Sequence, residues 1–401
     1  MKIHIITQYY YPEMGAAAVR WKDYSILLAE MGHDVTVICE RPNYPSGEIY
    51  SGYENLLIEQ HPNYNHTVIR TWVIINQRST FFQRIMCYTS FMISSFFAGI
   101  QLPKADMYIV SSPPLFAGIT GYILSILRKT PLIFDIRDLW PETAIELGEL
   151  NSWLSRRIGY YMQSLIYRQS SVFIVPVPGM ENYLRKNKYI NRKPILTLMN
   201  GVNEDILESA YKKTEISHDA IKIIYAGNIG LAQDIGTVIN AAQKLNNSFQ
   251  FLIIGDGVKK QEYEALVIKK SITNVKFLPP LSRDELLGKY HESHIGIVSL
   301  KKLPIFKNAI PSKTMEYLAS GLYVICMVKG EIEAMIRDSN AGICIDPENV
   351  DQLVDSLKSI EINEIISIGK TGKEYIQNNL RKKDLIRDIM DEIKPVVNST
   401  N

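Results

Sequence analysis

A single acid, Glu316, lies near the start of an expected helix in the stretch NAIPSKTMEYLASGLYVI, residues 308–325. A capping box would place a glutamate three residues after the N-cap, but Glu316 follows the expected cap, Ser312, by four. The amides at the helix start, together with Ser312 and Lys313, could hold a diphosphate. From the same turn, the Glu316 carboxylate could accept hydrogen bonds from both hydroxyls of a ribose. The alternative is a solvated helix residue, which is the default for any single glutamate.

A second group of charges ends an expected buried strand in FDIRDLWPE, residues 134–142. Its members are Asp135, Arg137 and Asp138, and a buried strand rarely ends in two acids and an arginine without pairing them. Ligands of parallel sheets lie beyond the carboxyl ends of the strands, so we expect a site at this position. The alternative is a structural ion pair between an aspartate and the arginine.

Glycine-containing loops follow several other strands. Gly15, in YYYPEMGAAAVR (9–20), leads into a helix whose first amides could hold a phosphate or an anionic transition state. The loop could equally be a flexible connection, with three alanines packing the helix on the sheet. Arg20 could serve a diphosphate or face solvent. YAGNIGLAQD (225–234) and IIGDG (253–257) are glycine turns, each a weak signal alone, which together line one edge of a second sheet.

The elements that must position these residues alternate between strand and helix in both halves of the chain. Apolar runs such as KIHIIT, DVTVICE and MYIVSS alternate with helical patterns, which predicts parallel strands joined by crossovers. The pattern restarts at IKIIYAGNIG, and 401 residues exceed what one core usually supports. We therefore predict an α/β fold with two Rossmann-like doubly wound domains, 1–200 and 201–375, facing each other across a cleft.

Particular helices are also expected in the second half. One should lie near 232–246, and another should open with a capping box from Ser282 to Glu285. The closing helices are predicted at 349–360 and about 364–393, with the segment from about 376 packing back on the first domain.

Composition excludes several classes of protein. A net charge of +2, with 46% hydrophobic and 21% charged residues, is ordinary for a globular protein and argues against a nucleic-acid partner. The cysteines form no cluster with metal-site spacing, so we expect reduced, buried thiols of a cytosolic protein. They are Cys39, Cys87, Cys326 and Cys344. The N-terminus, MKIHIITQYYYPE, has the pattern of a first strand and lacks the long apolar region of a signal peptide.

One apolar stretch, FFQRIMCYTSFMISSFFAGI (81–100), raises the question of a membrane helix. Gln83 and Arg84 shorten its uninterrupted part to about 16 residues, whereas spanning a bilayer needs about 20. We expect a buried or surface-lying helix instead.

Three motifs together carry a family resemblance. MNGVN (199–203), GNIG (227–230) and PSKTMEYLASGLYVI (311–325) make the chain resemble the retaining glycosyltransferases of family 4, which have the GT-B fold, and the likeness spans nearly the whole chain. DIRDLWPE with GNIGLAQD further resembles the bacterial branch that builds O-antigens and capsules, including amino-sugar transferases such as fucosamine transferases.

The resemblance implies roles for individual residues. That family has a Glu-x7-Glu motif, in which the second acid, matched by Glu316, binds the ribose and the first contacts the donor sugar. The first position holds Asn308, so an amide would contact the sugar. The arginine and lysine that commonly hold the diphosphate are replaced by Asn228 and Gln233, which leaves Lys313, Arg20, Lys307 and the helix amides to neutralise it. Where a histidine is frequent, Arg137 appears, with Asp138 in the acid position.

The expected site residues form two sets. The catalytic set is Gly15, Arg137 and Asp138. The donor-binding set is Arg20, Gly227, Asn228, Gly230, Gly257, Leu281, Asn308, Ala309, Ile310, Pro311, Ser312, Lys313 and Glu316.

The resemblance implies a hexosyltransferase-type glycosyltransferase. The first domain would bind the acceptor, and the second would bind the donor, a nucleotide diphosphate sugar that we expect to be UDP-linked and to carry an N-acetylated or deoxy amino sugar. The acceptor would be a lipid-linked saccharide at the inner face of the cytoplasmic membrane, in O-antigen, capsule or exopolysaccharide synthesis. No Asp-x-Asp occurs, so we expect no metal and no cofactor besides the nucleotide sugar.

Residues 81–100 and WLSRRIGYYMQSLIYR (153–168) are candidate surfaces for peripheral membrane contact, or else pack within the first domain. Two other functions remain open. One is a nucleotide-sugar 2-epimerase of the same fold, which needs no acceptor, and the other is a non-catalytic nucleotide-sugar-binding subunit.

Overall fold

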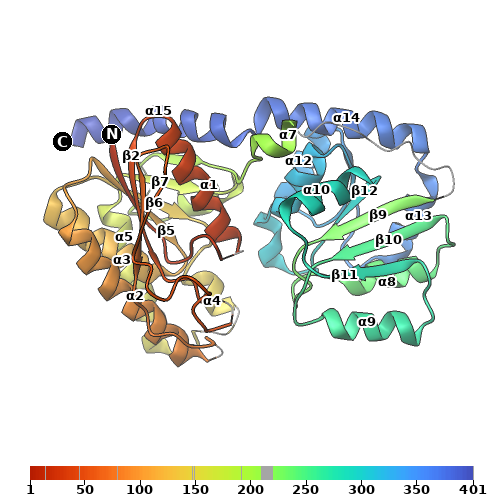
Figure 1. Ribbon diagram of the computed structural model, residues 1–401, viewed down its shortest axis with the longest axis horizontal. Helices are drawn as coiled ribbons and strands as arrows, with labels where there is room; N and C mark the ends of the chain where they lie inside the picture. Colours follow the sequence, from red (N-terminus) through yellow and green to blue (C-terminus); the bar gives the residue numbers. More distant parts are fainter. Residues whose placement is uncertain are drawn as a thin grey trace. The chain divides into compact units, whose positions relative to one another are not determined.

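The computed structural model describes residues 1–13, 15–44, 46–78, 80–146, 148, 150–190, 192–208 and 220–400. The chain divides into two compact units (Figure 1). Unit 1 comprises Met1–Asn200 and Lys383–Asn401, and unit 2 comprises Gly201–Lys382.

Unit 1 is built on a sheet with the strand order β3-β4-β2-β1-β5-β6-β7-β8. All pairings between these strands are parallel except the one between β3 and β4 at the edge. The central strands read as continuous apolar runs because both faces of the sheet are covered. The strands are β1 (Lys2–Ile6), β2 (Asp34–Glu40), β3 (Ile58–Gln60), β4 (His66–Thr71), β5 (Met107–Ser112), β6 (Leu132–Ile136), β7 (Val172–Val175) and β8 (Ile195–Thr197).

The helices of unit 1 cover the two faces of this sheet. Alternate side chains of β1, such as Ile3 and Ile5, form one core with α1 and with Ile389 of the C-terminal helix α15. On the other face, α3 contacts both α2 and α5, and a Cβ on Gly121 of α3 would meet Val110. The helices are α1 (Ala16–Glu30), α2 (Phe81–Gln101), α3 (Leu115–Arg128), α4 (Glu142–Glu146), α5 (Trp153–Gln169), α6 (Gly179–Leu184) and α15 (Lys382–Thr400).

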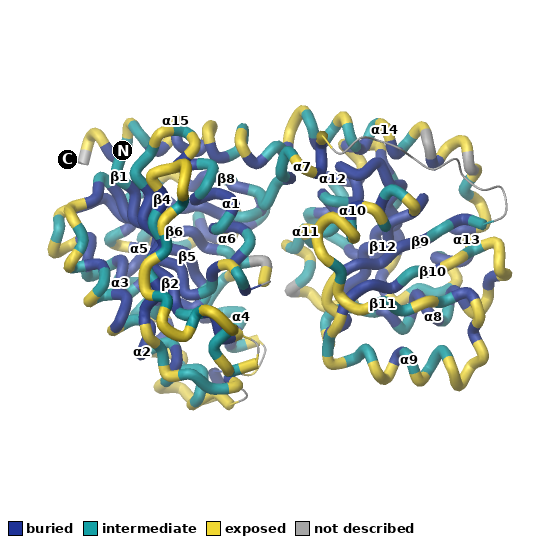
Figure 2. Tube along the Cα trace, in the orientation of Figure 1, coloured by how far each residue is buried: buried dark blue, intermediate teal, exposed yellow. Residues whose placement is uncertain are grey.

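Unit 2 contains a wholly parallel sheet with the order β11-β10-β9-β12-β13-β14. Its strands are β9 (Ile221–Ala226), β10 (Phe249–Ile254), β11 (Val275–Leu278), β12 (Ile295–Ser299), β13 (Tyr323–Met327) and β14 (Gly342–Cys344). Its helices are α7 (Glu204–Glu208), α8 (Ile235–Gln243), α9 (Lys260–Lys269), α10 (Arg283–His291), the 3-10 helix η1 (Pro304–Asn308), α11 (Ser312–Ala319), α12 (Glu331–Ser339), α13 (Val350–Ser359) and α14 (Ile362–Asn379). The central strands of both units are buried (Figure 2).

The predicted α/β fold with two parallel-sheet domains is therefore confirmed. The capping box of Ser282 with Glu285 is present at the start of α10. The expected cap of the Glu316 helix is wrong: Pro311 has extended ψ and is the N-cap, so Ser312 is already the first helical residue. The continuous helix expected over 364–393 is also wrong. The chain leaves the helix after α14, because the backbone around Arg381 forms a parallel bridge with Val202.

The cysteines and the apolar helix can be compared directly with expectation. All four cysteines are free thiols, three of them buried, whereas Cys344 is only half-buried. The 81–100 segment forms α2, which packs against α3 and against strands β2 and β4. Within the described residues, no helix is long and apolar enough to cross a bilayer.

Candidate active site

The carboxyl ends of the unit 2 strands carry closely packed glycine loops. Gly227 follows β9 with a φ of 138°, which L side chains rarely adopt. Gly257 follows β10, and a Cβ placed on it would come within 2.7 Å of Asn228 Oδ1. Gln233 fastens the first loop, since its Oε1 accepts from Gly230 N at 3.2 Å and from Asn228 Nδ2 at 3.5 Å. The two amide side chains therefore shape the loop and contribute no charge to it.

Lys313 projects from the first turn of α11 toward this loop. A Cβ on Gly227 would lie 2.9 Å from its ammonium nitrogen, which sits 3.6 Å from the centroid of the Tyr225 ring. The nitrogen is buried and finds no hydrogen-bond acceptor among the residues that the structure describes. Burial lowers the pKa of Lys313 to about 7, against a raising effect of Glu316. A buried ammonium without an acceptor is costly, so the position is suited to an anion.

The N-terminus of α11 adds to this positive environment. Its first amides have no partner within the helix, and the helix dipole favours negative charge there. Ser312 lies exposed at the first helical position, and no side-chain cap bond closes this terminus within the described chain. Four of the expected donor-binding residues lead into it from the end of η1, with Asn308 exposed and Ala309, Ile310 and Pro311 half-buried.

Glu316 lies one turn further along α11 with both oxygens engaged. Its Oε1 accepts from Arg283 Nη1 at 3.3 Å, and its Oε2 accepts from Tyr290 Oη at 3.1 Å. The side chain remains 26% exposed, so lone pairs are available for a ligand. Arg283 also contacts Asp205 at 3.4 Å. Glu316 is therefore a fixed carboxylate and not a freely solvated one.

Sequence reasoning missed Arg283 and Tyr290. It named Leu281, which is half-buried two residues before Arg283 at the start of α10. The position of Arg283, directly after the capping serine, could have marked it as a candidate. A single sequence, however, does not show that α10 and α11 are adjacent.

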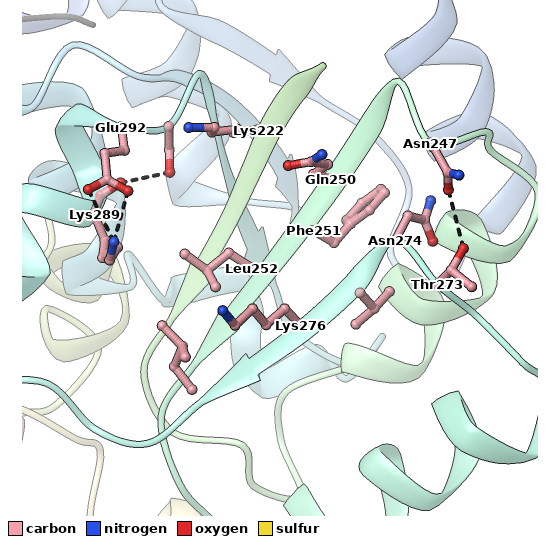
Figure 3. A pocket seen from close by; sticks show the side chains of 13 residues that line it. Lys222, Asn247, Gln250, Phe251, Leu252, Thr273, Asn274, Lys276, Lys289 and Glu292 are labelled. Carbon is pink, nitrogen blue, oxygen red and sulfur yellow. Dashed lines mark hydrogen bonds and ion pairs between the residues drawn. The ribbon is translucent and has the colours of Figure 1, made fainter. Parts of the chain in front are cut away.

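A separate hollow of about 540 Å³ lies against β9, β10 and β11 of the unit 2 sheet (Figure 3). It is lined by β9, β10 and β11 side chains such as Lys222, Leu252 and Lys276, and by Lys289, which pairs with Glu292 at 2.8 Å. Lys222 is the second residue of β9, far from the carboxyl end of that strand. Most of the lining residues therefore lie away from the rim where ligands of such sheets bind, although Leu278, the last residue of β11, is among them.

In unit 1, Asp135 is a buried acceptor at the end of β6. It accepts from Trp21 Nε1 and Ser111 Oγ, each at 2.8 Å, and from Arg20 at 3.3 Å. Arg20 is 3% exposed and also donates to Asn200. The structural ion pair considered for this region is thus present, formed by Arg20 and not by Arg137. A contact of Arg20 with a diphosphate would need this pair to open.

The three expected catalytic residues, Gly15, Arg137 and Asp138, line one pocket of unit 1 with a volume of about 550 Å³. Arg137 donates to the Pro113 carbonyl at 2.9 Å, and burial lowers the pKa of its guanidinium. Asp138 is exposed. The same pocket is lined by Glu13 and other side chains that sequence reasoning did not single out. They include Tyr9, Tyr44, Arg78, Arg84 and Tyr88.

Comparisons with known proteins match the two halves of the chain to two separate domain families. Residues 15–201 match the glycosyl transferase 4-like domain, and residues 208–382 match the glycosyl transferases group 1. The chain is 23% identical to the putative colanic acid biosynthesis glycosyl transferase WcaI of Escherichia coli K12, covering 98% of this chain and 100% of the relative.

Solved structures show the same fold. Sucrose-phosphate synthase of Thermosynechococcus elongatus superimposes with a TM-score of 0.78 at 14% identity, covering all of both chains. HepE of Anabaena, in complex with UDP-glucose, gives 0.69 at 13% identity, covering 98% of this chain and 100% of its own. The chain thus carries a glycosyl transferase 4-like domain followed by a domain of the glycosyl transferases group 1, and it is a glycosyltransferase of the GT-B fold.

Proposed function

We propose that this glycosyltransferase moves an N-acetylated or deoxy amino sugar from a UDP-linked donor to a lipid-linked saccharide, with retention of anomeric configuration, in the synthesis of a bacterial surface polysaccharide. The observation that carries the donor part is the buried ammonium of Lys313, which has no acceptor within the described chain and lies between the Gly227 loop and the start of α11. A diphosphate would supply the missing acceptor and the missing negative charge.

Lys313 supplies the positive charge for the diphosphate, because Asn228 and Gln233 are uncharged. When the bond between the sugar and the diphosphate breaks, its electron pair passes to the diphosphate oxygen. Lys313 and the first amides of α11 stabilise this charge because they are already in place before reaction. Glu316, fixed by Arg283 and Tyr290, receives the ribose hydroxyls. We propose that transfer needs no metal, and that EDTA leaves its rate unchanged.

The UDP donor and the polysaccharide pathway rest on the relatives. HepE was solved with UDP-glucose, and WcaI is named for colanic acid biosynthesis. A likeness at this identity supports a nucleotide sugar as the donor class but leaves the sugar open, and Asn308 in the position expected to contact it favours a group that an amide can recognise.

A membrane-bound acceptor is supported by exposed apolar side chains on unit 1. On α5, Arg157 lies 5.3 Å from the Trp153 ring, and Trp153 is 70% exposed. Aromatic residues beside arginines suit the interface between lipid and water. We propose that this surface docks on the inner face of the cytoplasmic membrane. The exposed side chains on α2 are Phe81, Phe82, Ile93 and Phe97, and those on α5 are Trp153, Leu154, Ile158, Tyr160 and Tyr161.

The decisive test is a thermal-stabilisation screen with UDP-, dTDP- and GDP-sugars on the wild type and on Lys313→Gln. A ligand that binds only the native state raises the melting temperature, so UDP-sugars should stabilise the wild type and stabilise the variant far less. No stabilisation by any nucleotide sugar would contradict the donor site. Incubation of the best donor with and without a membrane lipid extract then separates the alternatives. An epimerase converts the donor alone, a binding subunit never turns it over, and a transferase consumes it only with acceptor.

A further inference from the structure

The unit 1 pocket contains a buried carboxylate with one oxygen unused. Glu13 is 1% exposed, and its Oε1 accepts from the backbone amides of Asn43 and Tyr44, both at 2.9 Å. Its Oε2 has no donor in the described part of the chain. Glu13 is one of the residues that line the pocket, so the unused oxygen belongs to a side chain of its wall.

A guanidinium with unused donors lines the same pocket. Arg78 is 6% exposed, and its Nη2 donates to Glu40 at 2.6 Å and to Asn43 Oδ1 at 2.9 Å. Its Nε and Nη1 have no acceptor among the residues described. The group lies 5.1 Å from the Tyr9 ring centroid and 5.5 Å from that of Tyr44.

These two side chains are fixed by their surroundings. Asn43 is shared, since its backbone amide binds Glu13 and its side chain binds Arg78. Glu40 is held by Gln8 at 2.7 Å as well as by Arg78. Arg78 has a φ of 53°, a left-handed conformation that costs free energy in a residue with a side chain. A strained residue that keeps buried donors unused is typical of a functional position.

The unused atoms define the chemistry of a ligand. Glu13 Oε2 needs a donor and Arg78 needs acceptors, and a hydroxyl group is both. A phosphate would satisfy Arg78 but would bring negative charge against Glu13 and Asp138. Tyr9 and Tyr44 line the pocket beside Arg78, and aromatic side chains are suited to contact with a sugar ring.

We propose that Glu13 and Arg78 bind the hydroxyl groups of a pyranose residue of the acceptor saccharide, and so select the acceptor. This inference rests on the proposed transfer function, but the pocket lies wholly within unit 1 and can be tested without the donor.

The ionisation of Glu13 agrees with a missing donor. Burial and, to a smaller extent, Glu40 raise its pKa to about 7, against the lowering effects of the two backbone amides and of Arg78. A hydroxyl that donates to Oε2 stabilises the charged form, so a bound saccharide should bring this pKa down.

The test measures binding of methyl glycosides of glucose, galactose, fucose and N-acetylglucosamine by saturation-transfer NMR on the full chain, with inorganic phosphate as the anionic probe. Glu13→Gln keeps an oxygen for the two amides and turns only the unused atom from acceptor into donor. Arg78→Lys keeps a positive charge beside Glu40 but removes the several N–H donors of the guanidinium. Glu30→Gln, an exposed acid at the end of α1, is the matched control.

At least one glycoside should bind the wild type and Glu30→Gln, and bind both pocket variants at least tenfold more weakly, the scale of a hydrogen bond to a charged group. UDP should stabilise all four proteins equally, because its proposed site lies in unit 2. The proposal is overturned if no glycoside binds the wild type, if both pocket variants bind normally, or if phosphate alone binds. Loss of UDP binding in every protein would instead count against the proposed function.

Discussion

The ammonium of Lys313 lies over the face of the Tyr225 ring, 3.6 Å from its centroid, at the point where Gly227 leaves room for it. The ring quadrupole offers a cation some compensation but no hydrogen bond. Below pH 7, the free protein therefore holds a buried positive charge that lacks a hydrogen-bond acceptor in the described part of the chain, and a bound anion would supply one. The absence of a side chain at Gly227 leaves space for the nitrogen, because a Cβ there would come within 2.9 Å of it.

Nucleotide affinity should depend on pH through Lys313. Its pKa is lowered by burial to about 7 in the free protein, and a bound diphosphate should raise it, so binding takes up a proton above pH 7. Affinity for UDP should then fall by up to tenfold per unit from pH 7 to 9, a window in which the UDP phosphates are already ionised. Calorimetry at several pH values, in buffers of different ionisation enthalpy, measures both the affinity and the proton uptake.

Lys313→Gln is the control for that experiment. The pKa of Lys313 also determines whether this substitution stabilises or destabilises the free protein. The folded pKa lies below the unfolded value of about 10.5, so the unfolded state binds more protons between pH 7 and 10.5. Stability of the free wild type rises over that window, and the cost of the buried charge is complete below pH 7. The variant should lose the pH dependence of UDP binding and should melt higher than the wild type at pH 6. A steep slope retained in the variant would contradict the assignment.

Glu316→Gln should weaken UDP binding by about 1–3 kcal/mol, the scale of charge-assisted hydrogen bonds. The loss should be specific to the ribose, so the preference of the wild type for UDP over 2′-deoxy-UDP should disappear in the variant. Tyr290→Phe provides the comparison, since it removes a partner of Glu316 but leaves the carboxylate. Equal affinity of wild type and Glu316→Gln for UDP, by calorimetry, would reject the ribose role.

The sequence was sufficient for the fold because apolar strands buried on both faces have a strong signature, as in β1, β6 and β9. It also indicated Gly15, Arg137 and Asp138, which line one pocket, since all three follow strands of one parallel sheet. It did not indicate Arg78, because this residue lies in an irregular loop before α2 with no periodic pattern.

Contacts between residues that are far apart in the chain could not be predicted from the sequence either. Arg20 was expected to contact a ligand, and only the fold shows that it meets Asp135, 115 residues away in the chain. Likewise, the break between α14 and α15 depends on a backbone bridge to Val202, and no local breaker such as glycine or proline marks it.

Asp135→Asn should destabilise unit 1 strongly. The carboxylate is fully buried and compensates Arg20, so neutralising it leaves a buried guanidinium without its counter-charge. Breaking a buried pair in this way typically costs about 3–5 kcal/mol. Urea unfolding followed by tryptophan fluorescence, which reports on buried Trp21, measures the change.

The neighbouring aspartate gives a matched control for that measurement. Asp138 is exposed, so Asp138→Asn should leave the unfolding transition within about 0.5 kcal/mol of the wild type, as surface changes usually do. If Asp138 is catalytic, the same variant should lose transfer while UDP still stabilises it. Equal destabilisation by the two substitutions would show that Asp135 has no special role in the core.

Charge reversal of Arg156 and Arg157 to glutamate should weaken binding to anionic liposomes. Each basic residue near an anionic surface contributes about 1 kcal/mol, and the change replaces attraction by repulsion, so cosedimentation with phosphatidylglycerol vesicles should fall at least tenfold. The control is charge reversal of Lys222 and Lys276 on the unit 2 sheet, outside the proposed docking surface. It changes the net charge of the protein by the same amount. High salt should weaken wild-type binding, because exposed charges are screened. If both pairs reduce binding equally, the attraction is a general effect of net charge, and if neither does, α5 does not dock on the membrane.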